Sequence, residues 1–343
     1  MPSIGIYAST NAKVRTIRST LLNRRQYQQL AGSRDTHEFH GLLQQFNIGA
    51  GSGGQPVTER GIEHLILQDE ITRLRAVMKG SKFPVRPLLL LYIERFDLLM
   101  IKRLMRRIHS GEESTVQPFH DTRYVYPEGA FNAEGLNQLA KALDSTGYGA
   151  ILSDGLDAYR ETSSLFRIEV ALDRDLFTRT GELGKSLDRK NRQLLGRLLG
   201  LETDLINLSW VNRYHLFYKL TPAEIGDLLL PGGSRFSPEL LRRAAAEQTP
   251  SALLEELLKK RGSGVRISVP EEQSMSGMAL VEEFIYRALR DGARAAFMAF
   301  PFTLGATLGY IYLLKIQTRN LITLLNASYY ELAPDAMESL LVL

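Results

Sequence analysis

The sequence predicts an all-α protein made of three similar helical bundles that lie side by side with pseudo-threefold symmetry. Leu-rich runs with apolar residues three and four positions apart cover most of the 343 residues, and this is the spacing of an amphipathic helix. One set of side chains occurs three times, about 110 residues apart, which indicates three copies of one folding unit. Sustained alternation of apolar and polar residues is missing from the sequence, so strands are expected only as short pieces such as 265–269.

Three groups of markers define the repeat. Its anchors, in the middle of long apolar runs with steps of 107 and 113 residues, are Asp97, Asp204 and Gln317. Glutamates precede the anchors by 34 or 35 residues, at Glu63, Glu169 and Glu282. The segment LTPAEIGDLLL recurs 112 residues later as LAPDAMESLLV. We predict units over residues 1–112, 113–222 and 223–343, with helices allowed to cross the boundaries.

The helical runs follow one another with few interruptions. They are expected at residues 13–31, 36–46, 61–79, 86–109, 133–144, 164–181, 187–199, 201–219, 237–246, 250–261, 278–293, 302–327 and 334–342. Capping signals support the amino-terminal ends of two helices. Ser237 is an N-cap residue followed by proline. Thr221 is also followed by proline, and Glu224 is placed to complete a capping box with it. Clusters of glycine and proline predict linkers at 49–54, 109–129, 231–236 and 261–277.

The uncharged stretch 295–314 is long enough to be considered as a transmembrane helix. We interpret it instead as a buried helix pair, because Pro301, Gly305 and Gly309 interrupt it. The corresponding stretches of the other two copies carry several lysines and arginines, and one folding unit should not span lipid in only one of its copies.

Composition narrows the class of protein. The net charge of +4 is too weak for a chain of this length to imply a nucleic-acid partner. The absence of cysteine excludes disulfides, thiolate chemistry and cysteine-ligated zinc, and it fits a cytosolic protein. The amino terminus shows no apolar leader segment, so no signal peptide is expected.

No residue is predicted to be catalytic, to bind a cofactor or to hold a metal. The glycine-rich run 49–54 lacks the Lys-Ser/Thr that a phosphate-binding loop requires. His37 and His40 lie three residues apart, whereas zinc on one helix face requires a spacing of four. The anchor acids belong to different copies and form no evident acid–base pair. We interpret the anchors as structural ties within each unit, namely Glu94, Asp97, Asp204, Asn207, Gln317 and Asn320.

A basic cluster lies near the end of the first anchor helix, at Lys102, Arg103, Arg106 and Arg107. Cations are favoured at a helix carboxyl terminus by the macrodipole, so a solvated helix end is one interpretation. A docking patch for an acidic partner is the other. Nucleic acid is a weaker alternative, because no aromatic platform accompanies the cluster.

These residues resemble the C-subunit family of bacterial and archaeal V-type ATPases and ATP synthases, which is related to the eukaryotic V-ATPase d subunit. The resemblance covers essentially the whole chain. It rests on Tyr7-Ala8 and Asn11-Ala12 in an arginine-rich first helix, on the run from Glu169 to Arg174, and on the acidic-x-x-Asn-Leu pattern at Asp204 and, with glutamine, at Gln317. Met100 replaces a usual asparagine, and the run 49–54 looks like an insertion.

The resemblance implies a funnel-shaped adaptor without a catalytic site, a cofactor or a small-molecule substrate. Such a protein is peripheral to the membrane on its cytoplasmic face. It joins central-shaft subunits of the D and F type to the proteolipid ring and rotates with both. It transmits torque between ATP synthesis or hydrolysis and ion transport, including hydrogen-ion transport.

Two other interpretations stay open at this point. One is a soluble helical-repeat scaffold that binds another protein partner, although solenoid repeats are only about 33 to 47 residues long. The other is an unrecognised enzyme, for which the sequence offers no convincing pair of catalytic groups.

Overall fold

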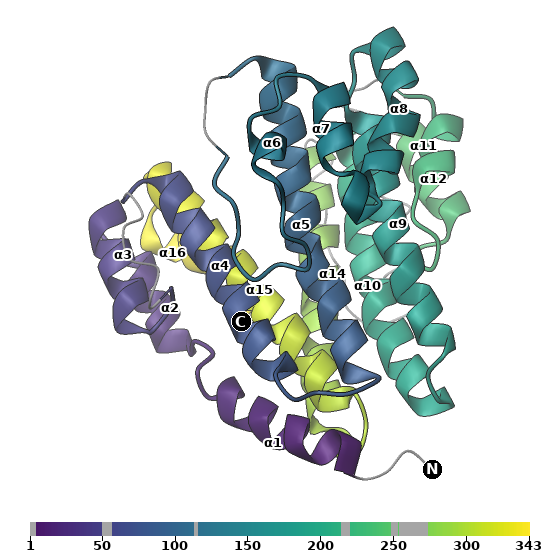
Figure 1. Cartoon of the computed structure of the whole chain (residues 1–343). Helices are drawn as coiled ribbons and strands as arrows, with labels where there is room; N and C mark the ends of the chain where they lie inside the picture. The colour runs from purple at the N-terminus through teal and green to yellow at the C-terminus, as the bar shows by residue number, and fades with distance from the viewer. Residues whose placement is uncertain (1–4, 50–56, 113–115, 214–219, 248–252, 254–273) are drawn as a thin grey trace. The chain divides into compact units, whose positions relative to one another are not determined.

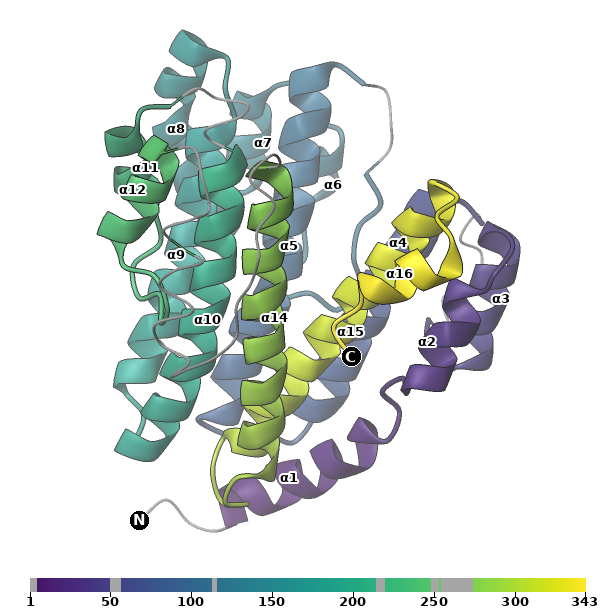
Figure 2. The same cartoon turned by 180° about the vertical axis from the view of Figure 1, so that it is seen from behind.

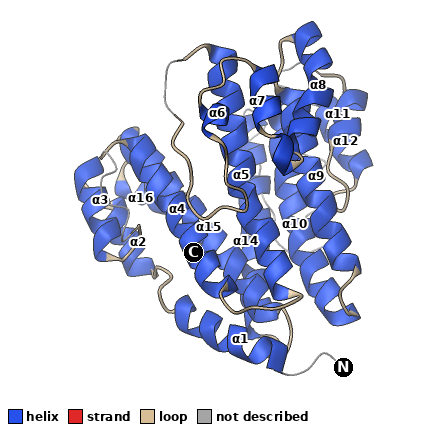
Figure 3. Cartoon of the chain, viewed as in Figure 1, coloured by secondary structure: helices blue, strands red, loops and turns tan. Residues whose placement is uncertain are grey.

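A computed structural model describes residues 5–49, 57–112, 116–213, 220–247, 253 and 274–343. Every regular element in these ranges is helical, and no strand occurs in them (Figures 1 and 3). The predicted all-α class is therefore confirmed. The short strand predicted at 265–269, nearly all of the helix predicted at 250–261 and most of the glycine-rich run 49–54 lie outside the described residues.

The chain divides into two units. Unit 1 comprises residues 1–186, 317–341 and 343, and unit 2 comprises residues 187–316 and 342. The division falls inside α15 (Gly305–Tyr329), so this helix contributes its first part to unit 2 and the rest to unit 1. The three predicted units, their boundaries and the funnel shape stay predictions.

Unit 1 contains most of the helices. They are α1 (Gly5–Arg18), α2 (Arg24–Ala31), α3 (Thr36–Gln45), α4 (Glu59–Met78), α5 (Val85–Ser110), α6 (Glu128–Phe131), α7 (Leu136–Ala142), α8 (Tyr148–Thr162), α9 (Phe166–Lys185) and α16 (Pro334–Ser339), with the 3-10 turn η1 (Asp144–Thr146). The long helix α5 packs against both α4 and α9. It ends at Gly111, whose φ of 68° is the left-handed conformation that glycine adopts readily.

The hairpin of α2 and α3 is packed against the carboxyl-terminal part of the chain. Its core is one apolar cluster made of Tyr27, Leu30, Ala31, Phe39, Leu43, Ile48, Ile62, Leu65, Ile66, Leu321, Leu324, Leu325, Ala327, Met337 and Leu341. Figure 2 shows α16 beside α2, as their contacts require. Residues near the two ends of the sequence, in the ranges 27–66 and 321–341, thus form a common core. No local sequence pattern indicates this contact.

Unit 2 contains α10 (Arg189–Arg213), α11 (Pro222–Leu228), α12 (Pro238–Glu247), α14 (Ser274–Met298) and the first part of α15. Helix α10 runs beside α14 and also contacts α12. The capping box predicted at Thr221 and Glu224 is confirmed at the start of α11.

Two predicted helix boundaries are wrong, and the expected runs leave out α8, which lies between the runs 133–144 and 164–181. The run 13–31 is two helices, because Asn23 and Gln26 form a capping box that starts α2. The runs 187–199 and 201–219 are one helix, α10, as far as the described residues extend. Gly200 does not interrupt α10. A Cβ there would lie 2.9 Å from Cβ of Ser234, so this glycine permits a loop to approach the helix closely.

The break predicted in the apolar stretch 295–314 is confirmed. Helix α14 ends at Met298 and α15 begins at Gly305. Among the described residues, no helix combines the length and the apolar character that crossing a membrane requires.

Candidate functional site: buried anchors and a basic cluster

The six predicted anchors lie in the interiors of the three long helices α5, α10 and α15. None is more than 3% exposed. A polar group in such a position is costly unless it is hydrogen-bonded, so the partners of each anchor explain why it is tolerated there.

Glu94 on α5 is the centre of an ionic network within unit 1. Arg179 of α9 makes a bidentate contact, with its Nη2 and Nη1 atoms 2.7 and 3.0 Å from the two carboxylate oxygens. Arg123 Nη1 donates to Oε2 at 2.5 Å, and the Tyr148 hydroxyl of α8 donates to Oε1. Burial alone would raise the pKa of Glu94, but the hydrogen bonds from Arg179 and Tyr148 and the charges of Arg179 and Arg123 hold that pKa below its usual value.

Asp97, one turn further along α5, holds the connection that follows this helix. Its Oδ2 accepts the backbone N–H of Arg123 at 3.1 Å. Its Oδ1 atom and the Tyr126 hydroxyl are both buried without a hydrogen bond of ordinary geometry to described residues. Burial raises the pKa of Asp97 to about 6, against the opposing effects of Thr122, Tyr126 and the Arg123 N–H, and the nearby charge of Glu94 adds to the increase.

Asp204 on α10 performs the same task in unit 2 with more hydrogen bonds. Its Oδ2 accepts the backbone N–H groups of Ser234 and Arg235 at 3.0 and 2.7 Å, and its Oδ1 accepts that of Phe236 at 3.3 Å. Burial raises the pKa of Asp204, and these hydrogen bonds oppose the increase. The carboxylate therefore satisfies three consecutive amide donors of one loop.

Asn207 lies one turn after Asp204 and binds the other end of the same connection. Its Oδ1 accepts the Leu230 N–H at 2.8 Å, and its Nδ2 donates to the Leu230 carbonyl at 2.9 Å. Both hydrogen-bonding groups of one backbone residue are thus satisfied by one side-chain amide. Asn is suited to this role because it carries a donor and an acceptor together.

The third anchor pair is in the part of α15 that belongs to unit 1. Gln317 Oε1 accepts the Leu22 N–H at 2.7 Å, in the connection between α1 and α2. The Tyr27 hydroxyl on α2 is hydrogen-bonded to Asn320. Asp97 and Gln317 therefore both act inside unit 1. Each binds a segment that leads into short helices.

Three of the six anchors, one on each long helix, hold the backbone that precedes a short helical segment. Asp97 binds the connection before α6, Asp204 the loop before α12, and Gln317 the connection before α2. In the third case the segment lies at the beginning of the chain, far from its anchor in sequence. Glutamine can occupy this position because an amide oxygen is sufficient to accept the single N–H of Leu22.

The partners of the buried glutamates are distant from them in the sequence. Arg123, Arg179 and Tyr148 surround Glu94, and they lie 29, 85 and 54 residues from it along the chain. In unit 2, Glu202 accepts the Tyr312 hydroxyl at 2.9 Å and contacts the Lys315 ammonium. No local spacing connects these residues, so only an alignment of related sequences or the structure could pair them.

The predicted basic cluster is engaged inside unit 1. Lys102 Nζ lies 2.5 Å from Asp173, Arg103 2.6 Å from Glu63, and Arg106 2.7 and 2.9 Å from the two carboxylate oxygens of Glu169. The repeat markers Glu63 and Glu169 are thus the partners of two arginines on α5. These ion pairs tie α5 to α4 and α9.

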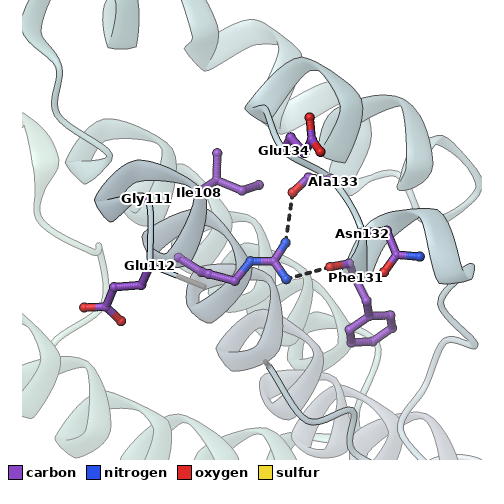
Figure 4. A pocket seen from close by; sticks show the side chains of 8 residues that line it. Ile108, Gly111, Glu112, Phe131, Asn132, Ala133 and Glu134 are labelled. Atoms are coloured by element: carbon purple, nitrogen blue, oxygen red, sulfur yellow. Dashed lines mark hydrogen bonds between the residues drawn. The ribbon is translucent and has the colours of Figure 1, made fainter. Parts of the chain in front are cut away.

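Arg107 differs from the other three cations. Its guanidinium donates to the carbonyl oxygens of Phe131 and Ala133 at 2.6 and 2.9 Å, which are neutral acceptors (Figure 4). It lines two cavities of about 400 and 500 Å³. The larger is also lined by Arg60 of α4, an exposed cation that sequence analysis missed although it lies one turn before Glu63.

The histidines form no metal centre among the residues with described positions, where no cluster of three histidine, aspartate or glutamate ligands occurs. His64 is buried and stacks on Phe119, with ring centroids 4.7 Å apart. Burial, and then the nearby charges of Arg103 and His120, lower the pKa of His64 to about 4, so it is neutral at physiological pH.

Comparison with known proteins gives a consistent result along the chain. A family model described as ATP synthase (C/AC39) subunit matches residues 10–340. The C subunit of the A-type ATP synthase of Methanosphaera stadtmanae is 24% identical over 92% of this chain and 82% of its own length. Its counterpart from Methanothermobacter thermautotrophicus is 24% identical over 96% of this chain and 86% of its own length. The counterpart from Methanobrevibacter smithii is 20% identical over 92% of this chain and 82% of its own length.

Proposed function

This chain belongs to the ATP synthase (C/AC39) subunit family, and on that premise we propose that it is the rotor adaptor of an A/V-type rotary ATPase. It joins central-shaft subunits of the D and F type to the membrane proteolipid ring and transmits torque between them. It is peripheral to the membrane, on the cytoplasmic face, and reaches the bilayer through the ring. It contributes no catalytic group of its own.

The observation that carries this proposal is the family match over residues 10–340, together with relatives that align over more than nine-tenths of the chain. Because the alignment covers nearly the whole chain, this chain has the length needed to perform the role of the complete relative. Similarity confined to one short segment would have supported only a shared fold.

The buried anchors support a mechanical role. A torque coupler has to resist deformation, and closely packed helices do so because their interiors have low compressibility. The hydrogen bonds of Asp97, Asp204 and Gln317 fix the connections between helices, which are otherwise the most deformable parts of a helical protein. The network at Glu94 further joins α5 to α8 and α9.

Part of the basic cluster is available to an acidic partner. Carboxylates within unit 1 already balance Lys102, Arg103 and Arg106. The guanidinium of Arg107 is hydrogen-bonded to neutral carbonyl groups, and Arg60 lines the same cavity. We therefore place the docking patch at Arg60 and Arg107, with the shaft as its partner. Arg60→Ala should weaken shaft binding severalfold, whereas Arg25→Ala, which removes an exposed cation on α2, should leave it unchanged.

The decisive experiment is reconstitution with the candidate partners. The full chain, immobilised, is expected to retain both the purified shaft subunits and the detergent-solubilised ring, and cross-linking should map the two contacts to different surfaces. When membranes are sedimented at low salt, the chain should sediment with them. It should be released from the membranes without the use of detergent. Retention of neither partner would refute the proposal and would favour a helical scaffold for another protein.

A further inference from the structure

The same dipeptide occupies the turn between two long helices in each unit. Phe83-Pro84 lies between α4 and α5 in unit 1, and Phe300-Pro301 lies between α14 and α15 in unit 2. Both phenylalanines are 55% exposed. They precede the anchors Asp97 and Gln317 by 14 and 17 residues, so the two turns correspond in the repeat. Single exposed apolar residues are common, but the same exposed aromatic at repeat-related turns requires an explanation.

The segments that flank the turn in unit 1 carry no acidic residue. Lys79, Lys82 and Arg86 are exposed around Phe83. Between Glu70 and Glu94 the sequence carries five cations and no acid, and α1 has no acid either. Lys13 of α1 donates to the Lys79 carbonyl at 2.5 Å, which brings a further cation to this turn. The segments that flank the exposed ring therefore carry several exposed cations and no carboxylate.

The turn in unit 2 repeats this combination. Lys190 Nζ lies 4.5 Å from the centroid of the Phe300 ring, and Phe302 packs edge-on against that ring at 5.3 Å. Met298, beside them in sequence, is 69% exposed. No acid occurs from residue 292 to residue 330. The nearby Asp188 is engaged in capping α10, where its carboxylate accepts the N–H groups of residues 190 and 191.

We infer that each of these turns binds the surface of a lipid bilayer that contains anionic headgroups. Exposed aromatic and apolar side chains enter the boundary between headgroups and acyl chains, while lysine ammonium groups pair with lipid phosphates. A diffuse surface with more cations than carboxylates suits a diffuse anionic surface better than a set of directed ion pairs with a protein. The inference rests on the proposed function, since that function places the chain beside the membrane.

Vesicle sedimentation with the purified full chain tests the inference in the absence of the ring. At low salt the chain should bind vesicles of phosphatidylcholine mixed with phosphatidylglycerol, and bind pure phosphatidylcholine much more weakly. Lys79→Ala and Lys82→Ala should each weaken binding roughly fivefold. Phe83→Ser and Phe300→Ser should weaken it to a similar extent. The matched controls, Arg25→Ala for charge and Val125→Ser for an exposed apolar residue, should bind as the unchanged chain does, and circular dichroism melts should show that every variant is folded.

The outcomes separate this inference from the proposed function. Equal binding to both kinds of vesicle, or an equal loss in the control variants, would overturn it. If the chain binds the ring in detergent but no vesicle, the lipid inference fails and the adaptor role stands. If the turn variants lose only ring binding, the turns contact protein instead of lipid. Binding to anionic vesicles by a chain that retains neither ring nor shaft would support the lipid contact and refute the adaptor role.

Discussion

A carboxylate in the interior of a long apolar helix is tolerated when it satisfies backbone donors that the fold would otherwise bury. Asp204 illustrates this principle, since it accepts three consecutive N–H groups from Ser234, Arg235 and Phe236. Gly233 allows the approach, because a Cβ at that position would lie 2.4 Å from Asp204 Oδ1. The side chain therefore acts as part of the loop's backbone hydrogen bonding.

Replacing Asp204 with alanine should lower the free energy of unfolding by about 3 kcal/mol, because buried amide donors lose their acceptor. Asp204→Asn keeps one acceptor oxygen and should lose less. Urea denaturation measures both effects. Asp154→Ala removes an exposed carboxylate of α8 and should change stability by less than about 0.5 kcal/mol. A loss in Asp204→Ala no greater than in this control would show that the loop does not depend on the carboxylate.

Asp97 should make stability depend on pH in the opposite sense to an ordinary paired carboxylate. Its pKa is about 6 in the folded chain against an ordinary value of 3.8, so the folded state binds the proton more tightly. The associated stabilisation is fully present below pH 3.8 and is lost as pH rises through 6. Over that range the unchanged chain should lose about 3 kcal/mol relative to Asp97→Asn. Unfolding curves of the two proteins at a series of pH values test this, and parallel pH profiles would contradict it.

At the scale of elements, α15 has two roles. Its first part belongs to unit 2, where Tyr312 and Lys315 bind Glu202. Its remainder belongs to unit 1, where Leu321, Leu324 and Leu325 complete the core of the α2–α3 hairpin. Two short helices could not bury enough apolar surface alone, so the hairpin depends on residues some three hundred positions away in the chain.

Leu324→Ala should therefore act most strongly on the amino-terminal hairpin. Leu324 is fully buried, and the cavity left by its truncation should cost about 3 kcal/mol. Hydrogen exchange should accelerate in α2 and α3 more than in α7 and α8, which pack elsewhere in unit 1. Leu332→Ala, at a residue 41% exposed, is the control and should leave the exchange pattern unchanged. Equal acceleration throughout the unit would show that the hairpin does not unfold separately.

At the scale of the whole molecule, charge is unevenly distributed although the net value is only +4. Carboxylates of unit 1 form ion pairs with most of the cations in the cluster on α5. The lysines at the turns around Phe83 and Phe300 are exposed instead. Ionic contacts to partners should consequently be made by a few exposed groups. Exposed charges of this kind are strongly screened by salt.

Association with the shaft subunits should weaken as the salt concentration rises, because screening acts on Arg60 and Arg107 at the cavity that we propose as the docking patch. Binding isotherms at several salt concentrations measure the slope. Arg60→Ala should flatten that slope, and Arg25→Ala should not. An affinity that stays constant from low to high salt would exclude an electrostatic docking patch while leaving an apolar shaft contact open.

Sequence reasoning located the long helices, their buried polar positions and the break before Gly305, because each is encoded in the spacing of neighbouring residues. It joined the first two helices into one run, since the apolar periodicity continues across Asn23 and the capping box formed with Gln26 was overlooked. It also treated Gly200 as an end of a helix, whereas the residue is small because a loop crosses there. The first error concerns a local cap, and only the second concerns what packs against the segment.

The sequence by itself determined the all-helical class and the positions of the anchors, because amphipathic periodicity and caps are set by residues a few positions apart. The family was indicated separately, by the resemblance of its motifs to those of a known family. Only the tertiary structure decided which groups meet. It paired Glu94 with Arg179 across 85 positions and Gln317 with Leu22 across 295. Such partners are selected by the close approach of helices during packing, and that approach depends on the whole set of apolar faces instead of on any local run of side chains.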